Sequence, residues 1–208
     1  MPDYDVIVVG AGNAALAAAV SAREQGAGRV VVLEKAPKDL RGGNTYYSGG
    51  LLRFAYDRAE DLLPLVPDAE RELPGFLAGV EPYPQKRFWD DLSRVTEGRT
   101  DPELAEILIG RSYETVRWMA GQGIVMEPAV SLSAVRVGTT IKWSPGALIR
   151  ARQEGVGLSG MWFAIAGRRD VEVRYDMSAV RLTQDARGRV TGVVACDPEG
   201  FRELTAKA

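Results

Sequence analysis

Residues 4–34 read YDVIVVGAGNAALAAAVSAREQGAGRVVVLE, and this stretch decides the fold. The β-branched run at 4–9 is typical of a strand buried on both faces of a parallel sheet. Residues 14–25 are rich in alanine and predict a helix, which Gly26 and Gly28 end. Residues 30–33 predict a second buried strand. The order strand, helix, strand therefore predicts a right-handed βαβ unit.

Residues 10–15 lie between the first strand and the helix, and we call them the first glycine segment. They fit the pattern G-x-G-x-x-G/A, in which the first two glycines allow a sharp turn and close approach to a pyrophosphate. The helix that follows offers unpaired N–H groups and the positive end of its dipole to phosphates. A dinucleotide site is therefore predicted at Gly10, Ala11, Gly12, Asn13, Ala14 and Ala15. The alternative is a turn without a ligand, which the matched flanking elements disfavour.

Glu34 ends the second strand, 24 residues after Gly10. An acidic side chain at this place accepts hydrogen bonds from an adenosine ribose. A carboxylate repels the 2′-phosphate of NADP, although the neighbouring Lys35 softens that repulsion. These residues do not separate NAD from FAD.

Residues 42–50, GGNTYYSGG, form a second glycine segment, and its four glycines let backbone pass close to a flat ligand. Asn44, Thr45 and Ser48 supply polar contacts. A flavoprotein needs such an element shortly after the second strand, whereas a nicotinamide-dependent dehydrogenase does not. The segment therefore favours FAD, and its alternative is a flexible surface loop.

The sequence resembles the flavoprotein family of fumarate reductase and succinate dehydrogenase. The resemblance rests on VIVVGAGNAALAAA (6–19), VVLEKAP (31–37), GGNTYYSGG (42–50) and VEVRYDMSAVRLTQDARGRVTGV (171–193). Within the family, GGNTYYSGGLLRF and the final GFRELTAKA are most similar to tricarballylate dehydrogenase-like and cobalamin-pathway members.

The resemblance implies FAD held at its pyrophosphate by the first glycine segment, with Glu34 and Lys35 near the ribose. It implies a strand with Ala179 beside the adenine, for which plain core packing is the alternative. The ribityl chain and flavin ring would then be lined by Gly42, Gly43, Asn44, Thr45, Ser48, Gly49 and Gly50. Members with covalent FAD carry a histidine where this chain has Asn44, and the chain has no histidine at all. We therefore expect non-covalent FAD.

The expected fold class is α/β: a Rossmann-like FAD-binding domain with a parallel central sheet, a helical middle segment and a small β-meander. We assign the whole of 1–208 to this domain, with the βαβ unit at 4–35, a mainly helical part at about 57–168 and strands at about 171–208. Asp101-Pro102-Glu103 predicts the start of a helix that ends at Gly123. Residues 185–188 predict a hairpin turn. Residues 155–158 are expected either to touch FAD or to lead as a loop into a helix from Ser159 to about Arg168.

Composition restricts the chemistry. The formal net charge of −2 does not favour a nucleic-acid partner. One cysteine excludes a disulfide framework, and the lack of histidine argues against a metal site or a Ser-His-Asp triad. No run is long and apolar enough for a membrane span, and we expect a cytoplasmic protein.

The expected function is therefore the FAD-binding portion of a flavin-dependent oxidoreductase that acts on CH–CH bonds, with a small carboxylate substrate and an electron-transfer partner. The resemblance implies that a capping domain and the catalytic residues lie beyond Ala208, so no catalytic residue is assigned. Arg136, Lys142 and Arg152 are interpreted as solvated surface charges, with substrate binding as the alternative. A nicotinamide-dependent dehydrogenase and an inactive nucleotide-binding fragment remain as alternatives.

Overall fold

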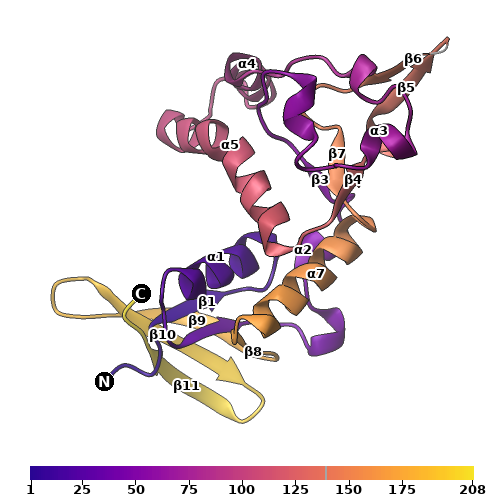
Figure 1. The fold of residues 1–208 in the computed structure, drawn as a ribbon. Coiled ribbons are helices and arrows are strands. Elements are labelled where there is room, and N and C mark those ends of the chain that lie inside the picture. Colours follow the sequence, from indigo (N-terminus) through magenta and orange to yellow (C-terminus); the bar gives the residue numbers. More distant parts are fainter. Residues whose placement is uncertain (139) are drawn as a thin grey trace. The chain divides into compact units, whose positions relative to one another are not determined.

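The computed structural model describes residues 1–138 and 140–208, which form two compact units. Unit 1 comprises residues 1–48 and 155–208, and unit 2 comprises residues 49–154. Figure 1 shows their elements.

Unit 1 contains the predicted βαβ unit. Strand β1 (Val6–Val9) runs parallel to β2 (Val30–Leu33), and helix α1 (Asn13–Glu24) connects them. After α1, Gly26 has a positive φ of 94°, which favours glycine and ends the helix. The prediction for this region is confirmed to within a residue or two.

The side chains of β2 point alternately to its two faces, and all four are buried. Val31 and Leu33 join the core cluster with the C-terminal strands, so Val30 and Val32 face the opposite side, where α1 packs. Strand β8 (Glu172–Arg174) extends the parallel sheet on the other edge of β2. In contrast to the expectation, β1 is not buried on both faces, because Val9 is 54% exposed.

A three-stranded antiparallel meander completes unit 1. It consists of β9 (Ser178–Gln184), β10 (Val190–Asp197) and β11 (Gly200–Thr205), in the order β11-β10-β9. The predicted turn is confirmed, since Asp185 accepts hydrogen bonds from the N–H groups of Arg187 and Arg189. The meander packs on the parallel sheet through a cluster of apolar side chains, which are Tyr4, Val31, Leu33, Met177, Val193, Ala195 and Leu204.

Unit 1 also contains two short helices and one long one. The 3₁₀ turn η1 (Lys38–Leu40) and the one-turn helix α2 (Gly43–Tyr46) follow β2. The second glycine segment is therefore partly helical. Helix α7 (Glu154–Arg168) starts earlier than the predicted 159, so residues 155–158 form its first turn and are not a separate loop.

Unit 2 contains helices α3 (Ala69–Glu72), α4 (Gln85–Val95), α5 (Pro102–Gln122) and α6 (Val130–Ser133), with 3₁₀ turns η2 (Ala59–Leu62) and η3 (Leu77–Gly79). Helix α5 is as predicted: the Asp101 side chain accepts the N–H groups of Glu103 and Leu104, and Gly123 ends it with φ 109°.

Helices outweigh strands at 57–168, but unit 2 also contains strands that the sequence did not indicate. Strands β3 (Leu51–Leu52), β7 (Ile149–Ala151) and β4 (Met126–Pro128) form a small antiparallel sheet. Strands β5 (Ala134–Val137) and β6 (Thr140–Trp143) form a hairpin. These strands are two to four residues long, too short for a period-2 pattern to be recognised in the sequence.

Candidate functional site

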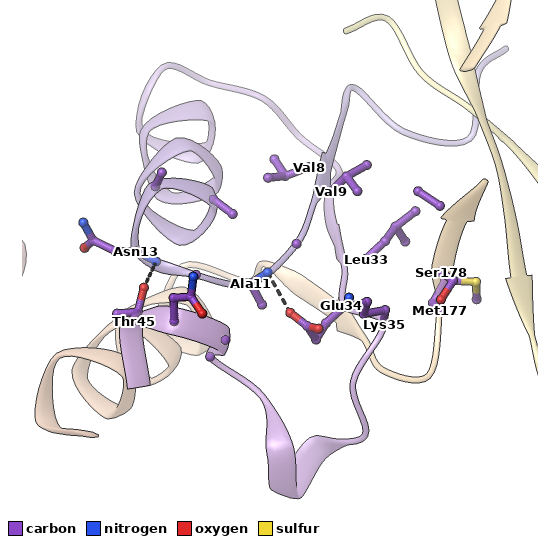
Figure 2. A pocket seen from close by; sticks show the side chains of 18 residues that line it. Val8, Val9, Ala11, Asn13, Leu33, Glu34, Lys35, Thr45, Met177 and Ser178 are labelled. Atoms are coloured by element: carbon purple, nitrogen blue, oxygen red, sulfur yellow. Dashed lines mark hydrogen bonds between the residues drawn. The ribbon is translucent and has the colours of Figure 1, made fainter. Parts of the chain in front are cut away.

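A cavity of about 750 Å³ opens at the end of β1 and β2 in unit 1. Figure 2 shows its lining, which comes from both glycine segments, from the end of β2 and from the start of β9. Thirteen of the predicted cofactor residues line it: Gly10, Ala11, Gly12, Asn13, Ala14, Ala15, Glu34, Lys35, Gly42, Gly43, Asn44, Thr45 and Ala179. The structure thus brings together residues that lie far apart in the sequence.

The first turn of α1 faces this cavity without a cap from its own N-cap residue. Gly12 has no side chain to accept the N–H groups of the first turn. Thr45 Oγ1 accepts the N–H of Asn13 at 2.9 Å, and nothing in the described part of the chain accepts those of Ala14 and Ala15. Two donors at the positive end of a helix dipole therefore remain for an anion.

Glu34 connects the end of β2 to the first glycine segment. Its side chain is 7% exposed, and its Oε2 accepts the N–H of Ala11 at 2.9 Å while Oε1 accepts the N–H of Ala36 at 2.8 Å. Each carboxylate oxygen still has a free lone pair for a hydroxyl donor. The dashed line in Figure 2 marks the bond to Ala11 at the cavity wall.

The start of β9 reaches the cavity through a backbone connection to β2. The N–H of Met177 donates to the carbonyl of Glu34 at 3.0 Å, which places the next residues, Ser178 and Ala179, at the cavity. Strand β9 is an edge strand of the meander, so part of its backbone is unpaired and open to a ligand.

The second glycine segment divides into two parts. Gly43 has a φ of 51°, and a Cβ added there would meet no atom within 4 Å, so backbone at this point is open to a ligand. Ser48, Gly49 and Gly50 do not line the cavity. Ser48 donates its hydroxyl to the carbonyl of Thr45, and a Cβ at Gly50 would lie 2.7 Å from the backbone of Glu154. Packing against backbone is thus a sufficient reason for glycine at position 50.

Several lining residues were missed. The sequence indicated no role in the site for five residues that also line the cavity: Val8, Val9, Leu33, Met177 and Ser178. Position relative to the first glycine segment was the available signal for Val8 and Val9, because ligands in open α/β sheets bind at the carboxyl ends of strands. The exposure of Val9 follows from this place.

The cationic residues of unit 2 take no part in this cavity. Arg136, Lys142 and Arg152 are exposed, and Arg152 Nε lies 3.7 Å from Glu127. Among residues 1–138 and 140–208, no group of three or more potential metal ligands comes together. The helices described by the structure include none of the length and apolarity that a membrane crossing requires.

Comparison with known proteins gives a consistent result. Residues 5–208 match the family described as "FAD binding domain". Fumarate reductase (cytochrome) of Shewanella frigidimarina is 23% identical over 190 residues, which cover 91% of this chain and 29% of that protein. Urocanate reductase of Eggerthella lenta is 29% identical over 195 residues, which cover 93% of this chain and 28% of that protein.

Two solved structures have a similar fold. The open conformation of a flavocytochrome c3 fumarate reductase superposes with a TM-score of 0.74 at 22% identity, over 100% of this chain and 33% of that one. A 3-ketosteroid dehydrogenase from Rhodococcus jostii gives a TM-score of 0.61 at 20% identity, over 100% of this chain and 45% of that one. The chain spans about three tenths of the length of the curated relatives it matches.

Proposed function

The chain belongs to the FAD binding domain family, and on that premise we propose that its cavity binds FAD as part of a flavin-dependent oxidoreductase acting on a small carboxylate. The relatives named fumarate reductase and urocanate reductase support this class of reaction. The finer likeness to tricarballylate dehydrogenase-like members stays a prediction, as does a cytoplasmic location.

The residues present fit the ADP half of FAD. The uncapped N–H groups of Ala14 and Ala15 suit a pyrophosphate, and the carboxylate of Glu34 has lone pairs for the ribose hydroxyls. The open space beside Gly10 and Gly43 allows backbone contact with the cofactor. The exposed start of β9, with Ala179, is available to the adenine.

One observation carries the proposal: Thr45 Oγ1 accepts the Asn13 N–H, so both glycine segments border a single cavity. A nicotinamide-dependent dehydrogenase needs only the first segment and Glu34. The volume of about 750 Å³ lies within the range of cofactor sites.

Bound FAD supplies hydride transfer, and the protein supplies binding and orientation. In this chain, the first turn of α1 would hold the pyrophosphate, Glu34 would accept from the ribose hydroxyls, and Gly43, Asn44 and Thr45 would line the ribityl chain. Attachment is non-covalent in this proposal, because Asn44 stands where a histidine would form the bond and the chain contains none.

Reconstitution tests the proposal. The purified protein is titrated with FAD, FMN, ADP and NADH, and bound cofactor is released with acid to test for a covalent link. FAD and ADP should bind, FMN should bind much more weakly because it lacks the ADP half, and acid should release all the flavin. Binding of NADH without FAD would show that the protein is a nicotinamide-dependent dehydrogenase.

Turnover on the full-length protein tests the substrate class. Fumarate, urocanate and tricarballylate are each tested as substrates, with a reduced dye of low potential as electron donor or an oxidised dye of high potential as electron acceptor. A ketosteroid is tested in the same way as a substrate without a carboxylate. The proposal expects turnover of a carboxylate, and activity confined to the ketosteroid would contradict the substrate class but not the FAD site.

A further inference from the structure

Helix α7 contacts both glycine segments. The N–H of Gly155, in its first turn, donates to the carbonyl of Ser48 at 2.9 Å. One turn later, Ser159 packs so closely on Gly42 that a Cβ at Gly42 would collide with its hydroxyl. The sequence offered no reason to connect this helix with the first glycine segment, more than 130 residues away.

Trp162 makes that connection. Its side chain is fully buried at 0% exposure, and its indole N–H donates to Asn13 Oδ1 at 2.6 Å. A buried indole N–H needs an acceptor, and here the acceptor is a side chain of the first glycine segment. Since Oδ1 is engaged, the amide of Asn13 is held in one of its two orientations, with its NH₂ group on the other side.

Asn13 passes this restraint to Thr45. The backbone N–H of the same residue donates to Thr45 Oγ1 at 2.9 Å, the bond drawn in Figure 2. The hydroxyl of Thr45 acts as the acceptor there, so its own proton stays available for an anion. Trp162, Asn13 and Thr45 thus link α7, α1 and α2 by two hydrogen bonds.

We propose that Trp162 is a positioning residue for the FAD site: its indole N–H, through Asn13, holds the first turn of α1 and the Thr45 hydroxyl in the arrangement that receives the pyrophosphate. This inference rests on the proposed function, because it assumes that FAD is the ligand. Trp162 does not line the cavity, and its indole N–H reaches the first glycine segment through the side chain of Asn13.

A double-mutant cycle tests the proposal. Trp162→Phe keeps an aromatic ring but removes the donor, and Asn13→Ala removes the acceptor. Each single variant should weaken FAD binding about three- to tenfold, the loss expected for one hydrogen bond. The double variant should bind FAD no more weakly than the weaker-binding single variant, because both changes remove the same hydrogen bond.

Two controls separate positioning from general packing. Trp89→Phe changes a half-buried tryptophan on α4 in unit 2 and should leave the FAD dissociation constant unchanged. Site-specific incorporation of 3-benzothienylalanine at position 162 keeps the bicyclic shape and lacks the N–H, so it gives a foldable variant even where Phe leaves a void. A purely structural role predicts a lower melting temperature of the apoprotein with an unchanged dissociation constant.

The outcomes are distinguishable. If the wild-type protein binds FAD, and the N–H-deficient variants bind as tightly or the cycle is additive, the role of Trp162 is refuted while the FAD site stands. If the wild-type protein does not bind FAD, both the proposed function and this inference fail. In the apoprotein, Asn13→Ala should also shift one indole N–H resonance, that of Trp162. If this resonance does not shift, the hydrogen bond between Trp162 and Asn13 is refuted.

Discussion

Gly10 and Gly26 have nearly the same positive φ, 92° and 94°, but only Gly10 lines the cavity. A Cβ at either position would meet no atom within 4 Å. Gly10→Ala and Gly26→Ala should therefore destabilise the fold alike, by about 1–2 kcal/mol, the cost of a left-handed backbone with a side chain. Only Gly10→Ala should weaken FAD binding, because its methyl group projects where the cofactor approaches.

Urea unfolding and FAD titration of the two variants check this expectation. Equal loss of FAD affinity in both would mean that the cavity at Gly10 is not the cofactor site, since Gly26 lies at the far end of α1.

Glu34 offers a second test at the level of one side chain. Both of its oxygens accept backbone N–H groups, so in Glu34→Gln the amide nitrogen must face a donor. We expect a loss of about 1–3 kcal/mol in the free energy of unfolding. FAD affinity should fall about tenfold or more, because the ribose loses a charged acceptor.

Thermal unfolding of the apoprotein and calorimetric FAD titration measure the two effects. The conservative variant Glu34→Asp keeps the charge but shortens the reach, and it should retain more ADP affinity than Glu34→Gln. The opposite order would contradict a role of the carboxylate charge.

Residues with a local signature could be predicted from the sequence, and residues with a distant partner could not. The first glycine segment and Glu34 follow from spacing within one βαβ unit, and the structure places all of them at one cavity. Trp162 looks like any apolar helix residue, because the bond that gives it a role joins it to a residue 149 positions away. Likewise, the hydroxyl of Thr45 was expected beside the flavin, and its bond to the Asn13 N–H depends on how two segments meet.

At the scale of elements, α7 shows why the glycines of one helix are not equivalent. Gly155 packs on the backbone of the second glycine segment, where a Cβ would overlap the carbonyls of Thr45 and Ser48. Gly167 is exposed on the same helix, with nothing within 4 Å of an added Cβ. Gly155→Ala should cost about 1–3 kcal/mol through forced backbone movement, whereas Gly167→Ala should stabilise by about 0.5–1 kcal/mol through helix propensity.

Chemical denaturation of both variants measures this contrast. Gly155→Ala should also weaken FAD binding, because Thr45 moves with its carbonyl. If Gly155→Ala were as stable as Gly167→Ala, the close packing of α7 on the second glycine segment would be refuted.

Elements with strong local signals were predicted best. The cap at Asp101, the proline at the first helical position and the glycine at the end identified α5, and the Asp185 turn identified the β9–β10 hairpin. The strands of unit 2 were missed because they are short and are formed by pairing between distant segments, such as β3 with β7. Sequence periodicity carries no information about such pairs.

At the scale of the whole molecule, unit 1 is formed by the two ends of the chain and unit 2 by its middle. The N-terminal residues lie beside the C-terminal ones: Tyr4 pairs with Ala206, and the N–H of Ile7 donates to the carbonyl of Ala208 at 3.0 Å. The pairing of the N-terminal with the C-terminal residues was not predictable from the sequence. The predicted βαβ unit specifies β2 as the neighbour on one edge of β1, and it specifies nothing for the other edge. This pairing makes the stability of unit 1 sensitive to the charges that hold the two ends together.

Asp5 is the charge that should report on this pairing. Its Oδ1 lies 2.6 Å from Lys207 Nζ, and its Oδ2 accepts the N–H of Arg29 at 2.8 Å. The hydrogen bond from Lys207, followed by that from Arg29, lowers the pKa of Asp5 to about 2 from its ordinary 3.8. A pKa lowered by folding stabilises the protein above the unfolded-state value, and this stabilisation is lost as the pH falls through the folded-state value.

Asp5→Asn should therefore be less stable than the wild type at about pH 6, and the difference should shrink as the pH falls from about 4 towards about 2. Urea unfolding of both proteins across this range measures the difference in their free energy of unfolding. Asp3, Asp185 and Asp197 also have lowered pKa values, but they are present in both proteins, so their contributions cancel. Lys207→Met should remove part of the same pH dependence, and in the double variant the two losses should not add, because they share one contact. A difference that stays constant down to about pH 2 would mean that the carboxylate of Asp5 does not hold the two ends of the chain together.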